Sequence, residues 1–380
     1  MQNALSGTPQ IKSEKDYRLA FSMIPGLNIT TGHKLLEKVG DERAFFEQST
    51  STLQALTQTT GKYLSNDSRI KFLQDAEAES KFIGNKHIDC LYFTDEDRYP
   101  RRLAECTDAP VMLYRTGICN LDAAHIVAIV GTRHCTAYGM DVARHLVKQL
   151  SEQLDDLVIV SGLAYGIDVA AHRAALEFDV PTVAVTAHPL NTIYPADHRD
   201  TARTIIKKGG ALVTEYATCM AVHRGNFLAR NRIIAGLSDV TVVVESDIRG
   251  GAMATARMAS DYARDVFAVP GRLSDKYSSG TNHLINNQTA ALITGADDII
   301  DTMRWHRKPK EGDQPSLFEQ ITPEKQQVLD LLRNHPDYNV NDICVRLSKS
   351  YSEMADLLFQ MEMDDIIIAL PGGRYSCAVK

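Results

Sequence analysis

The chain has 380 residues, more than one ordinary domain needs, and this length suggests two or three domains. Its composition, 44% hydrophobic and 23% charged, is that of a soluble globular protein, and no apolar run approaches the roughly 20 residues of a membrane helix. A net charge of −7 argues against binding duplex DNA through overall charge. Any nucleic-acid site must therefore be a local basic surface.

The seven cysteines are scattered, odd in number and without C-x-x-C spacing. This pattern indicates neither a zinc site nor a disulfide framework, and it favours a reducing compartment. The first residues lack the basic start and apolar core of a signal peptide. We therefore expect a cytoplasmic protein without membrane insertion and without a metal ion or cofactor.

Residues 1–95 are predicted to form a small helical domain. The sequence from about Tyr17 to Phe93 has helical periodicity, and Pro25-Gly26 forms a turn between two apolar-periodic runs. This is the layout of SAM-like and helix-hairpin-helix modules. A purely structural role is favoured over DNA contact, because the hairpin lacks a G-x-G and has few basic residues.

Residues 96–303 are predicted to form an α/β domain with an extended Rossmann-like, doubly wound sheet. Val111–Tyr114 is expected as an edge strand, and further strands then alternate with helices. Their expected cores are Ile126–Val130, Val158–Ser161, Thr182–Thr186, Ala211–Thr214, Val240–Val244, Val266–Val269 and Ala291–Ile293. The carboxyl ends of parallel strands, followed by helix N-termini, form a crevice suited to phosphate.

The last part of the chain is predicted to be a linker, 304–321, and a winged-helix domain, 322–380. The linker is charged, contains three breakers and shows no periodicity. Beyond it we expect helices at 323–334, 340–347 and 350–362, and then a small hairpin with a Pro371-Gly372-Gly373 tip.

Two glycine turns follow the first parallel strands. Gly131-Thr132-Arg133 follows one, and Ser161-Gly162 leads through Gly166 into a helix after the other. Neither is G-x-G-x-x-G, no P-loop occurs, and Ser161 lacks the G-x-S-x-G elbow of hydrolases. The Arg133 guanidinium could form a bidentate hydrogen bond to a phosphate whose other oxygens face backbone amides, or it could pair with a nearby carboxylate.

Asp168 and His172 lie one helical turn apart. They could be a base and its orienting acid, or two metal ligands. An acid at a helix start beside a satisfied core histidine is the favoured interpretation.

The segment Tyr216–Ser238 contains no acidic residue, yet it is basic and carries an aromatic ring. Its basic, amide and aromatic side chains are His223, Arg224, Asn226, Phe227, Arg230, Asn231 and Arg232. A phenylalanine offers a stacking platform for an unpaired base, and arginines follow the backbone. A solvated basic loop with a core phenylalanine explains the absence of acids poorly. A further glycine turn at Gly250-Gly251 could offer amides to phosphate or permit close packing of a helix on the sheet.

Several ordered motifs resemble the DNA-processing protein A family, also called Smf. They are the Gly131-Thr132-Arg133 turn, 161–168 with Ala171-His172, Phe227 with 230–238, and Val269-Pro270-Gly271. The resemblance covers most of the chain, because longer members have a helical N-terminal domain, an extended Rossmann domain and a winged helix.

The resemblance implies a non-enzymatic protein that binds incoming single-stranded DNA during competence, DNA uptake and natural transformation. It implies that the protein protects this DNA, loads the RecA recombinase for recombination and forms a homodimer through the Rossmann domain. The candidate DNA-binding residues are Gly131, Arg133, Ser161, Gly162, Gly166, Arg224, Gly225, Asn226, Phe227, Arg230, Asn231, Arg232 and Gly251.

The chain departs from the family pattern at a few positions. The usual glycine-rich turn before Tyr194-Pro195 is absent, and the final Asn of that motif is His198. The family's Ser-Gly-Ser is Gly250-Gly251-Ala252, so two hydroxyls are lost, and Leu228 replaces a usual proline. These changes concern single contacts, especially around Gly251, and leave the arginine and phenylalanine set intact.

Two alternative functions are open. One is a nucleoside-monophosphate phosphoribohydrolase on a related sheet, although the nearest text to its Pro-Gly-Gly-x-Gly-Thr hallmark, 250–255, lacks the proline and the following acid. The other makes the winged helix a duplex-DNA regulator. Its expected third helix, 350–362, carries three acids and no Arg or Lys, which favours contact with protein over DNA.

Overall fold

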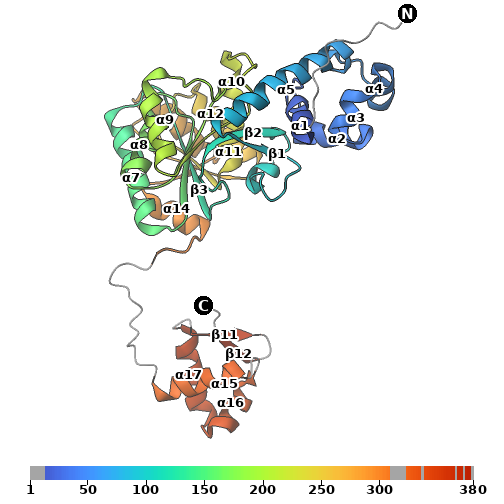
Figure 1. Ribbon diagram of the computed structural model, residues 1–380. Helices are drawn as coiled ribbons and strands as arrows, with labels where there is room; N and C mark the ends of the chain where they lie inside the picture. The colour runs from blue at the N-terminus through green and yellow to red at the C-terminus, as the bar shows by residue number, and fades with distance from the viewer. Residues whose placement is uncertain (1–12, 309–321, 335–337, 364–365, 371–372, 378–380) are drawn as a thin grey trace, which may run out of the picture. The chain divides into compact units, whose positions relative to one another are not determined.

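The computed structural model describes residues 13–308, 322–334, 338–363, 366–370 and 373–377 (Figure 1). The chain divides into two compact units, 1–308 and 309–380. Most of the predicted linker, 309–321, lies outside the described residues.

Helices form the start of the first unit. They are α1 (Glu14–Ser22), α2 (Ile29–Val39), α3 (Glu42–Glu47), α4 (Thr50–Thr57), the short 3-10 turn η1 (Lys62–Leu64) and α5 (Asn66–Lys86). The predicted turn separates α1 from α2, with Gly26 at φ +76°, and the Asn28 side chain caps α2. The helical prediction was wrong for Asp89–Tyr92, which forms strand β1 because it pairs with the next strand.

A sheet of nine strands is the centre of this unit, in the order β1-β2-β6-β5-β4-β3-β7-β8-β9. The strands after β1 are β2 (Met112–Gly117), β3 (His125–Val130), β4 (Leu157–Ser161), β5 (Thr182–Val185), β6 (Ala211–Thr214), β7 (Val240–Val243), β8 (Asp265–Ala268) and β9 (Ala291–Leu292). The ladders from β6 to β9 are parallel, as predicted, and β2 is antiparallel to β6. The segment expected at the edge is β2, and β1 covers it.

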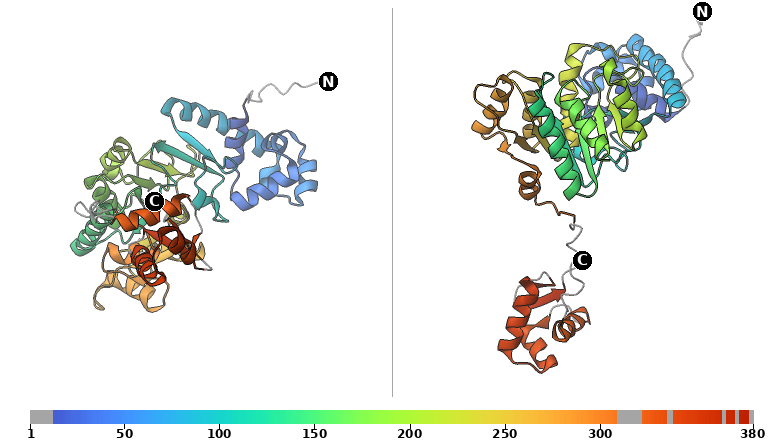
Figure 2. Two further views of the ribbon diagram at one scale, coloured as in Figure 1. Left: turned by 90° about the horizontal axis from the view of Figure 1, so that it is seen from below. Right: turned by 90° about the vertical axis from the view of Figure 1, so that its left-hand side faces the viewer.

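Helices cover both faces of the sheet, as Figures 1 and 2 show. Alternate strand residues point to opposite faces. Val127 and Ile129 of β3 pack with α7 (Ala137–Gln153), α8 (Ile167–Glu177) and α14 (Ala296–Met303). Ala128 and Val130 belong to the core on the other face, with α11 (Asn231–Leu237) and α12 (Gly251–Asp261). The remaining elements are α6 (Arg101–Ala104), η2 (Ala196–His198), α9 (Arg199–Lys207), α10 (Arg224–Ala229), η3 (Lys276–Ser278) and α13 (Ser279–Asn286).

The order of strands reverses at β3. The chain builds β4, β5 and β6 on one side of β3 and then places β7, β8 and β9 on the other side. The connections after β3 and β7 therefore leave toward opposite faces, and a crevice opens between them at the carboxyl ends of the strands.

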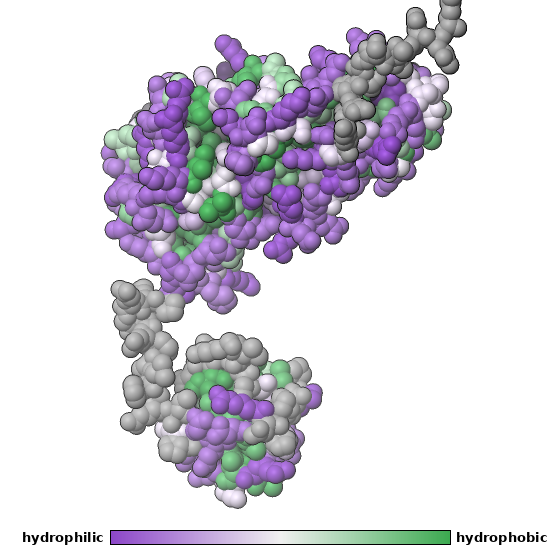
Figure 3. Space-filling model, in the orientation of Figure 1, coloured by the Kyte–Doolittle hydropathy of each residue, from purple (hydrophilic) through white to green (hydrophobic). Residues whose placement is uncertain are grey.

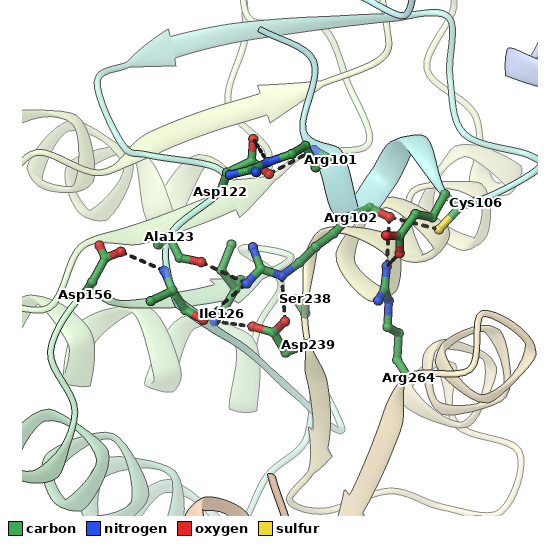
Figure 4. A network of polar contacts seen from close by, with 12 residues as sticks. Arg101, Arg102, Cys106, Asp122, Ala123, Ile126, Asp156, Ser238, Asp239 and Arg264 are labelled. Atoms are coloured by element: carbon green, nitrogen blue, oxygen red, sulfur yellow. Dashed lines mark hydrogen bonds and ion pairs between the residues drawn. The ribbon is translucent and has the colours of Figure 1, made fainter. Parts of the chain in front are cut away.

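At the amino ends of β3 and β7, away from the crevice, a polar network links the two strands (Figure 4). Asp239, just before β7, accepts hydrogen bonds from Arg102 Nε at 2.6 Å and from the Ile126 N–H at 2.8 Å. Arg102 also donates to the Ala123 carbonyl at 2.9 Å, and its own carbonyl accepts from Arg264 at 2.9 Å. The network thus holds the starts of β3 and β7 in register beneath the crevice.

The first residues of the predicted linker, 304–308, are packed against the sheet domain. The Trp305 ring lies edge-on to His125, with centroids 4.8 Å apart, and Arg307 pairs with Asp301 at 2.6 Å. Lys308 N–H donates to the Gln153 carbonyl at 2.6 Å. The linker prediction was therefore wrong for these residues, because charge and missing periodicity do not reveal docking onto α7 and α14.

The second unit contains α15 (Pro323–Asn334), α16 (Val340–Leu347), α17 (Tyr351–Met363) and a small antiparallel sheet. The sheet has the order β10-β12-β11, with β10 (Tyr338–Asn339), β11 (Ile367–Leu370) and β12 (Arg374–Cys377). The three predicted helices and the hairpin strands are confirmed. Pro371 and Gly372 of the predicted tip lie outside the described residues, and the assignment as a winged helix stays a prediction. Across the described part of the chain, no helix has the length and apolar character to cross a membrane.

Candidate nucleic-acid interface

A pocket of about 410 Å³ lies at the carboxyl end of β3, where the strand order reverses. The turn after β3, helices α10 and α11 and the start of α12 form its walls. Seven of the predicted site residues line it: Gly131, Arg133, Arg224, Phe227, Arg230, Asn231 and Gly251. The fold thus brings together residues that lie up to 120 positions apart in the sequence.

An arginine and two aromatic rings lie against one another at this pocket. The Arg133 guanidinium lies over the Phe227 ring, 5.5 Å from its centroid, and the Tyr194 ring meets Phe227 edge-on at 5.5 Å. Arg133 and Arg224 are exposed, and neither pairs with a carboxylate of the described residues. The alternative that Arg133 serves a structural ion pair therefore finds no partner there, and its charge faces the pocket.

Arg230 differs from these two arginines because it is buried, with 4% of its surface exposed. Its guanidinium donates to the carbonyl of Gly162 at 2.6 Å and to that of Val185. Burial lowers the pKa of Arg230 to about 10, while Asp168 opposes the shift, so the group stays charged at neutral pH. Arg230 therefore forms the charged floor of the pocket and joins the ends of β4 and β5.

The acid and histidine on α8 are structural. Asp168 is buried, accepts backbone hydrogen bonds from Ala164, Gly162 and Gly131, and has its pKa raised by burial. His172 Nδ1 lies 2.8 Å from Thr182 Oγ1, and burial lowers the pKa of this histidine to about 3, so it is neutral. The described residues hold no cluster that could bind a metal ion. The favoured structural interpretation of this pair agrees with these contacts.

Glycines allow the turns beneath the pocket to pack closely. Gly166 has φ +79°, and a Cβ there would overlap the carbonyl oxygen of Thr132. A Cβ at Gly162 would lie 2.6 Å from the guanidinium carbon of Arg230. These two glycines thus position the turn and the arginine, and we assign them no ligand contact.

Several other predicted site residues do not line the pocket. Ser161 is buried and donates its hydroxyl to the Ile129 carbonyl at 2.6 Å. Asn226 is buried and donates to the Ala221 carbonyl at 3.2 Å, while Gly225 is exposed at the start of α10. Their side chains and positions support the turns around the pocket.

Arg232 faces away from the pocket and forms a two-bond ion pair with Glu215, at 3.0 and 2.6 Å. The absence of acids between Tyr216 and Ser238 concealed this pair, because Glu215 lies one residue outside that window. Arg232 is therefore engaged with a carboxylate in a separate groove.

Sequence reasoning did not assign Tyr194, His134 or Leu228 to the site. His134 and Leu228 line the pocket, and Tyr194 carries the edge-on contact to Phe227. A signal existed for Tyr194, which stands in a Tyr-Pro motif of the family. His134 and Leu228 carried no such signal, and only the path of the folded chain places them at the pocket.

Comparisons with known proteins identify the family of this chain. The family model described as DNA recombination-mediator protein A matches residues 90–304, which is more than half of the chain. The Smf protein of Escherichia coli K12 is 34% identical over 298 residues, covering 75% of this chain and 78% of that protein. The DNA processing protein DprA of Streptococcus pneumoniae R6 is 38% identical over 205 residues, covering 54% of this chain and 71% of that protein.

Two solved structures are similar in fold and sequence. DprA from Streptococcus pneumoniae has a TM-score of 0.60 and 30% identity, covering 77% of this chain and 98% of that chain. A second structure concerns the single-stranded DNA binding mode of DNA processing protein A from Helicobacter pylori. It has a TM-score of 0.51 and 32% identity and covers 57% of this chain and 95% of that chain. With its α/β sheet and its family match, the chain belongs to the DNA recombination-mediator protein A family.

Proposed function

We propose that this chain binds single-stranded DNA in the pocket at the strand-order reversal and acts in the cytoplasm as a non-enzymatic recombination mediator. In this role it protects incoming DNA during natural transformation, loads RecA onto it and works as a homodimer through the α/β domain. The observation that carries the proposal is that Arg133 lies over the Phe227 ring at the pocket and pairs with no carboxylate of the described residues.

The chemistry of the pocket suits an unpaired strand. Phe227 is half-buried and offers its ring to a base, a contact that tolerates any sequence. Arg133 and Arg224 can each bind a phosphate, and Arg230 adds positive charge beneath them. A duplex hides its bases from such a ring, so preference for single strands follows from the stacking.

The relatives support this proposal. The family is described as a recombination mediator, and the Helicobacter pylori relative is a protein whose single-stranded DNA binding mode has been described. The RecA and homodimer parts rest on the family resemblance. The RecA part is tested by the rate of RecA filament formation on single-stranded DNA to which this protein is already bound. The homodimer part is tested by the mass of the protein in solution.

The DNA-binding part is tested by fluorescence anisotropy of a labelled oligonucleotide, single-stranded and duplex, across a salt series. We expect Phe227→Ala to weaken single-strand binding about 5- to 150-fold, the equivalent of about 1–3 kcal/mol per stacked base. Arg133→Ala and Arg224→Ala should each weaken binding and reduce the salt slope by about 0.7.

The matched control is Arg203→Ala, because Arg203 is an exposed arginine on α9 paired with Asp200. It should leave affinity and salt slope unchanged. Equal affinity for duplex and single strand, or equal losses in the control and the pocket variants, would contradict the proposal.

The hydrolase alternative needs a carboxylate at a bound nucleotide. The acidic side chain that lines the pocket is Asp168, which is buried and bonded to backbone N–H groups. No observation in the described part of the molecule therefore favours this alternative. Release of free base from nucleoside monophosphates by the purified protein would restore it.

A further inference from the structure

A second groove, of about 730 Å³, lies next to the pocket. It runs between α7 and α8, and it shares Arg133 and His134 with the pocket. The two hollows are therefore adjacent, with Arg133 and His134 in the wall that they share. A strand that left the pocket past Arg133 would meet this groove next.

Tyr165 stands where the groove meets the pocket. The next residue, Gly166, packs directly against the backbone of Thr132 and Arg133, which places Tyr165 beside the shared wall. The Tyr165 side chain is 42% exposed. Its hydroxyl donates to Asp197 at 2.8 Å, and its ring lies edge-on to His198 with centroids 4.9 Å apart. These contacts hold an exposed aromatic ring in one orientation, as a stacking platform requires.

Positive charge follows along α8. Arg173 lines the groove, is exposed and has no hydrogen-bond or ion-pair partner in the described residues. It lies seven residues beyond Gly166, about 10 Å along the helix. Arg144 and Glu177 form an ion pair, with Arg144 Nε 2.8 Å from Glu177 Oε2, so their opposite charges cancel. Arg133 and Arg173 then outweigh Asp141, the remaining acid that lines the groove.

A further hollow, on the other side of α10, is acidic. Asp108 and Glu215 line it, and its arginine, Arg232, is paired with Glu215. A polyanion is repelled there and attracted along α8. The charges thus favour one direction for a strand that extends beyond the pocket.

We propose that single-stranded DNA continues from the pocket along the α7–α8 groove, with a base stacked on Tyr165 and a phosphate bound by Arg173. This inference rests on the proposed function of the pocket. It makes the footprint on one protomer longer than the pocket alone, and it assigns the added length to two named side chains.

The test is affinity as a function of oligonucleotide length, with oligothymidylates of about 4 to 16 nucleotides, the range of single-strand sites. For the wild type, affinity should rise when the strand becomes long enough to pass Arg133. The Tyr165→Ala/Arg173→Ala variant should bind the shortest oligonucleotide like the wild type and bind the longer ones at least fivefold more weakly. Tyr165→Phe should retain most of the gain, because it keeps the ring and its edge-on contact with His198 and loses only the bond to Asp197.

The outcomes separate this inference from the function on which it rests. If the wild type does not bind the short oligonucleotide, the proposed function fails. If short strands bind but the double variant gains as much with length as the wild type, the groove is not the path. An equal loss in Arg203→Ala would also overturn it, because the effect would then be one of general charge.

Discussion

Arginines and glycines at the pocket have divided roles. Arg133 lies over an aromatic ring and has no ion pair within the part of the chain that the structure describes, whereas Arg230 is buried and bonds to two backbone carbonyls. Loss of the Arg230 side chain would leave these two buried carbonyls without a donor, which costs about 1–3 kcal/mol for each such group. A binding defect in an Arg230 variant would therefore reflect the pocket's shape as well as its contacts.

Two glycines at the site form a natural pair for a stability test. Gly166→Ala should lower the free energy of unfolding by roughly 1–3 kcal/mol, because φ is +79° and the new Cβ meets the Thr132 carbonyl. Gly251→Ala should stay within about 0.5 kcal/mol of the wild type, because a Cβ there meets nothing within 4 Å. Denaturant unfolding followed by the fluorescence of Trp305, the single tryptophan, measures both. Equal stability of the two variants would contradict the packing of these turns.

The buried His172 predicts a loss of stability in mild acid. Its pKa in the folded state is about 3, lowered chiefly by burial, whereas an unfolded histidine titrates near 6.5. The unfolded chain therefore binds more protons between these values, and the free energy of unfolding falls as pH is lowered through this window. From pH 7 to pH 5 this one group contributes a loss of about 2 kcal/mol.

Urea unfolding of the wild type and of His172→Gln at the two pH values isolates this contribution. The fall in stability should be smaller in the variant by about the same amount. His188, whose pKa burial also lowers, remains in both proteins and cancels in the difference. An equal pH dependence in the two proteins would show that His172 is not buried in its neutral form.

At the scale of elements, periodicity and turn residues predicted most helices and all seven parallel strands. The errors share one cause. Asp89–Tyr92 is a strand because β2 offers it a partner, and residues 304–308 are ordered because α7 and α14 offer them carbonyl and carboxylate groups. Tertiary partners of this kind leave no local pattern.

The segment 304–308 gives a prediction at this scale. A chain that ends after Met303 loses the Trp305–His125 contact and the Arg307 and Lys308 bonds, so it should melt several degrees below a chain that ends after Lys308. Thermal unfolding followed by circular dichroism compares the two truncations. Identical melting temperatures would mean that this segment adds nothing to the sheet domain.

At the scale of the whole molecule, DNA binding is expected to belong to the first unit. The overall charge is −7, so attraction must come from the local arginines of the pocket. Hydrophilic residues cover most of the visible surface of this unit, with apolar side chains in smaller areas (Figure 3). In the second unit, α17 carries Glu353, Asp356 and Glu362 and no Lys or Arg.

Removal of every residue after Lys308 should therefore leave single-strand affinity within about twofold of the full chain. Anisotropy with the same oligonucleotide measures this, and the Arg133→Ala full-length protein serves as the control for a true loss. A collapse of binding in the truncated chain would assign DNA contacts to the second unit.

The sequence by itself determined the alternation of strands and helices, the basic and aromatic segment, the glycine turns and the family resemblance. These are local patterns, carried by neighbouring residues with a fixed period or spacing. Only the tertiary structure decided the surroundings of each arginine: Arg133 lies over Phe227, Arg230 is buried between two strand ends, and Arg232 pairs with Glu215. Three arginines that the sequence assigned to one site differ because burial and partners depend on side chains that are distant in sequence, and only the fold brings these together.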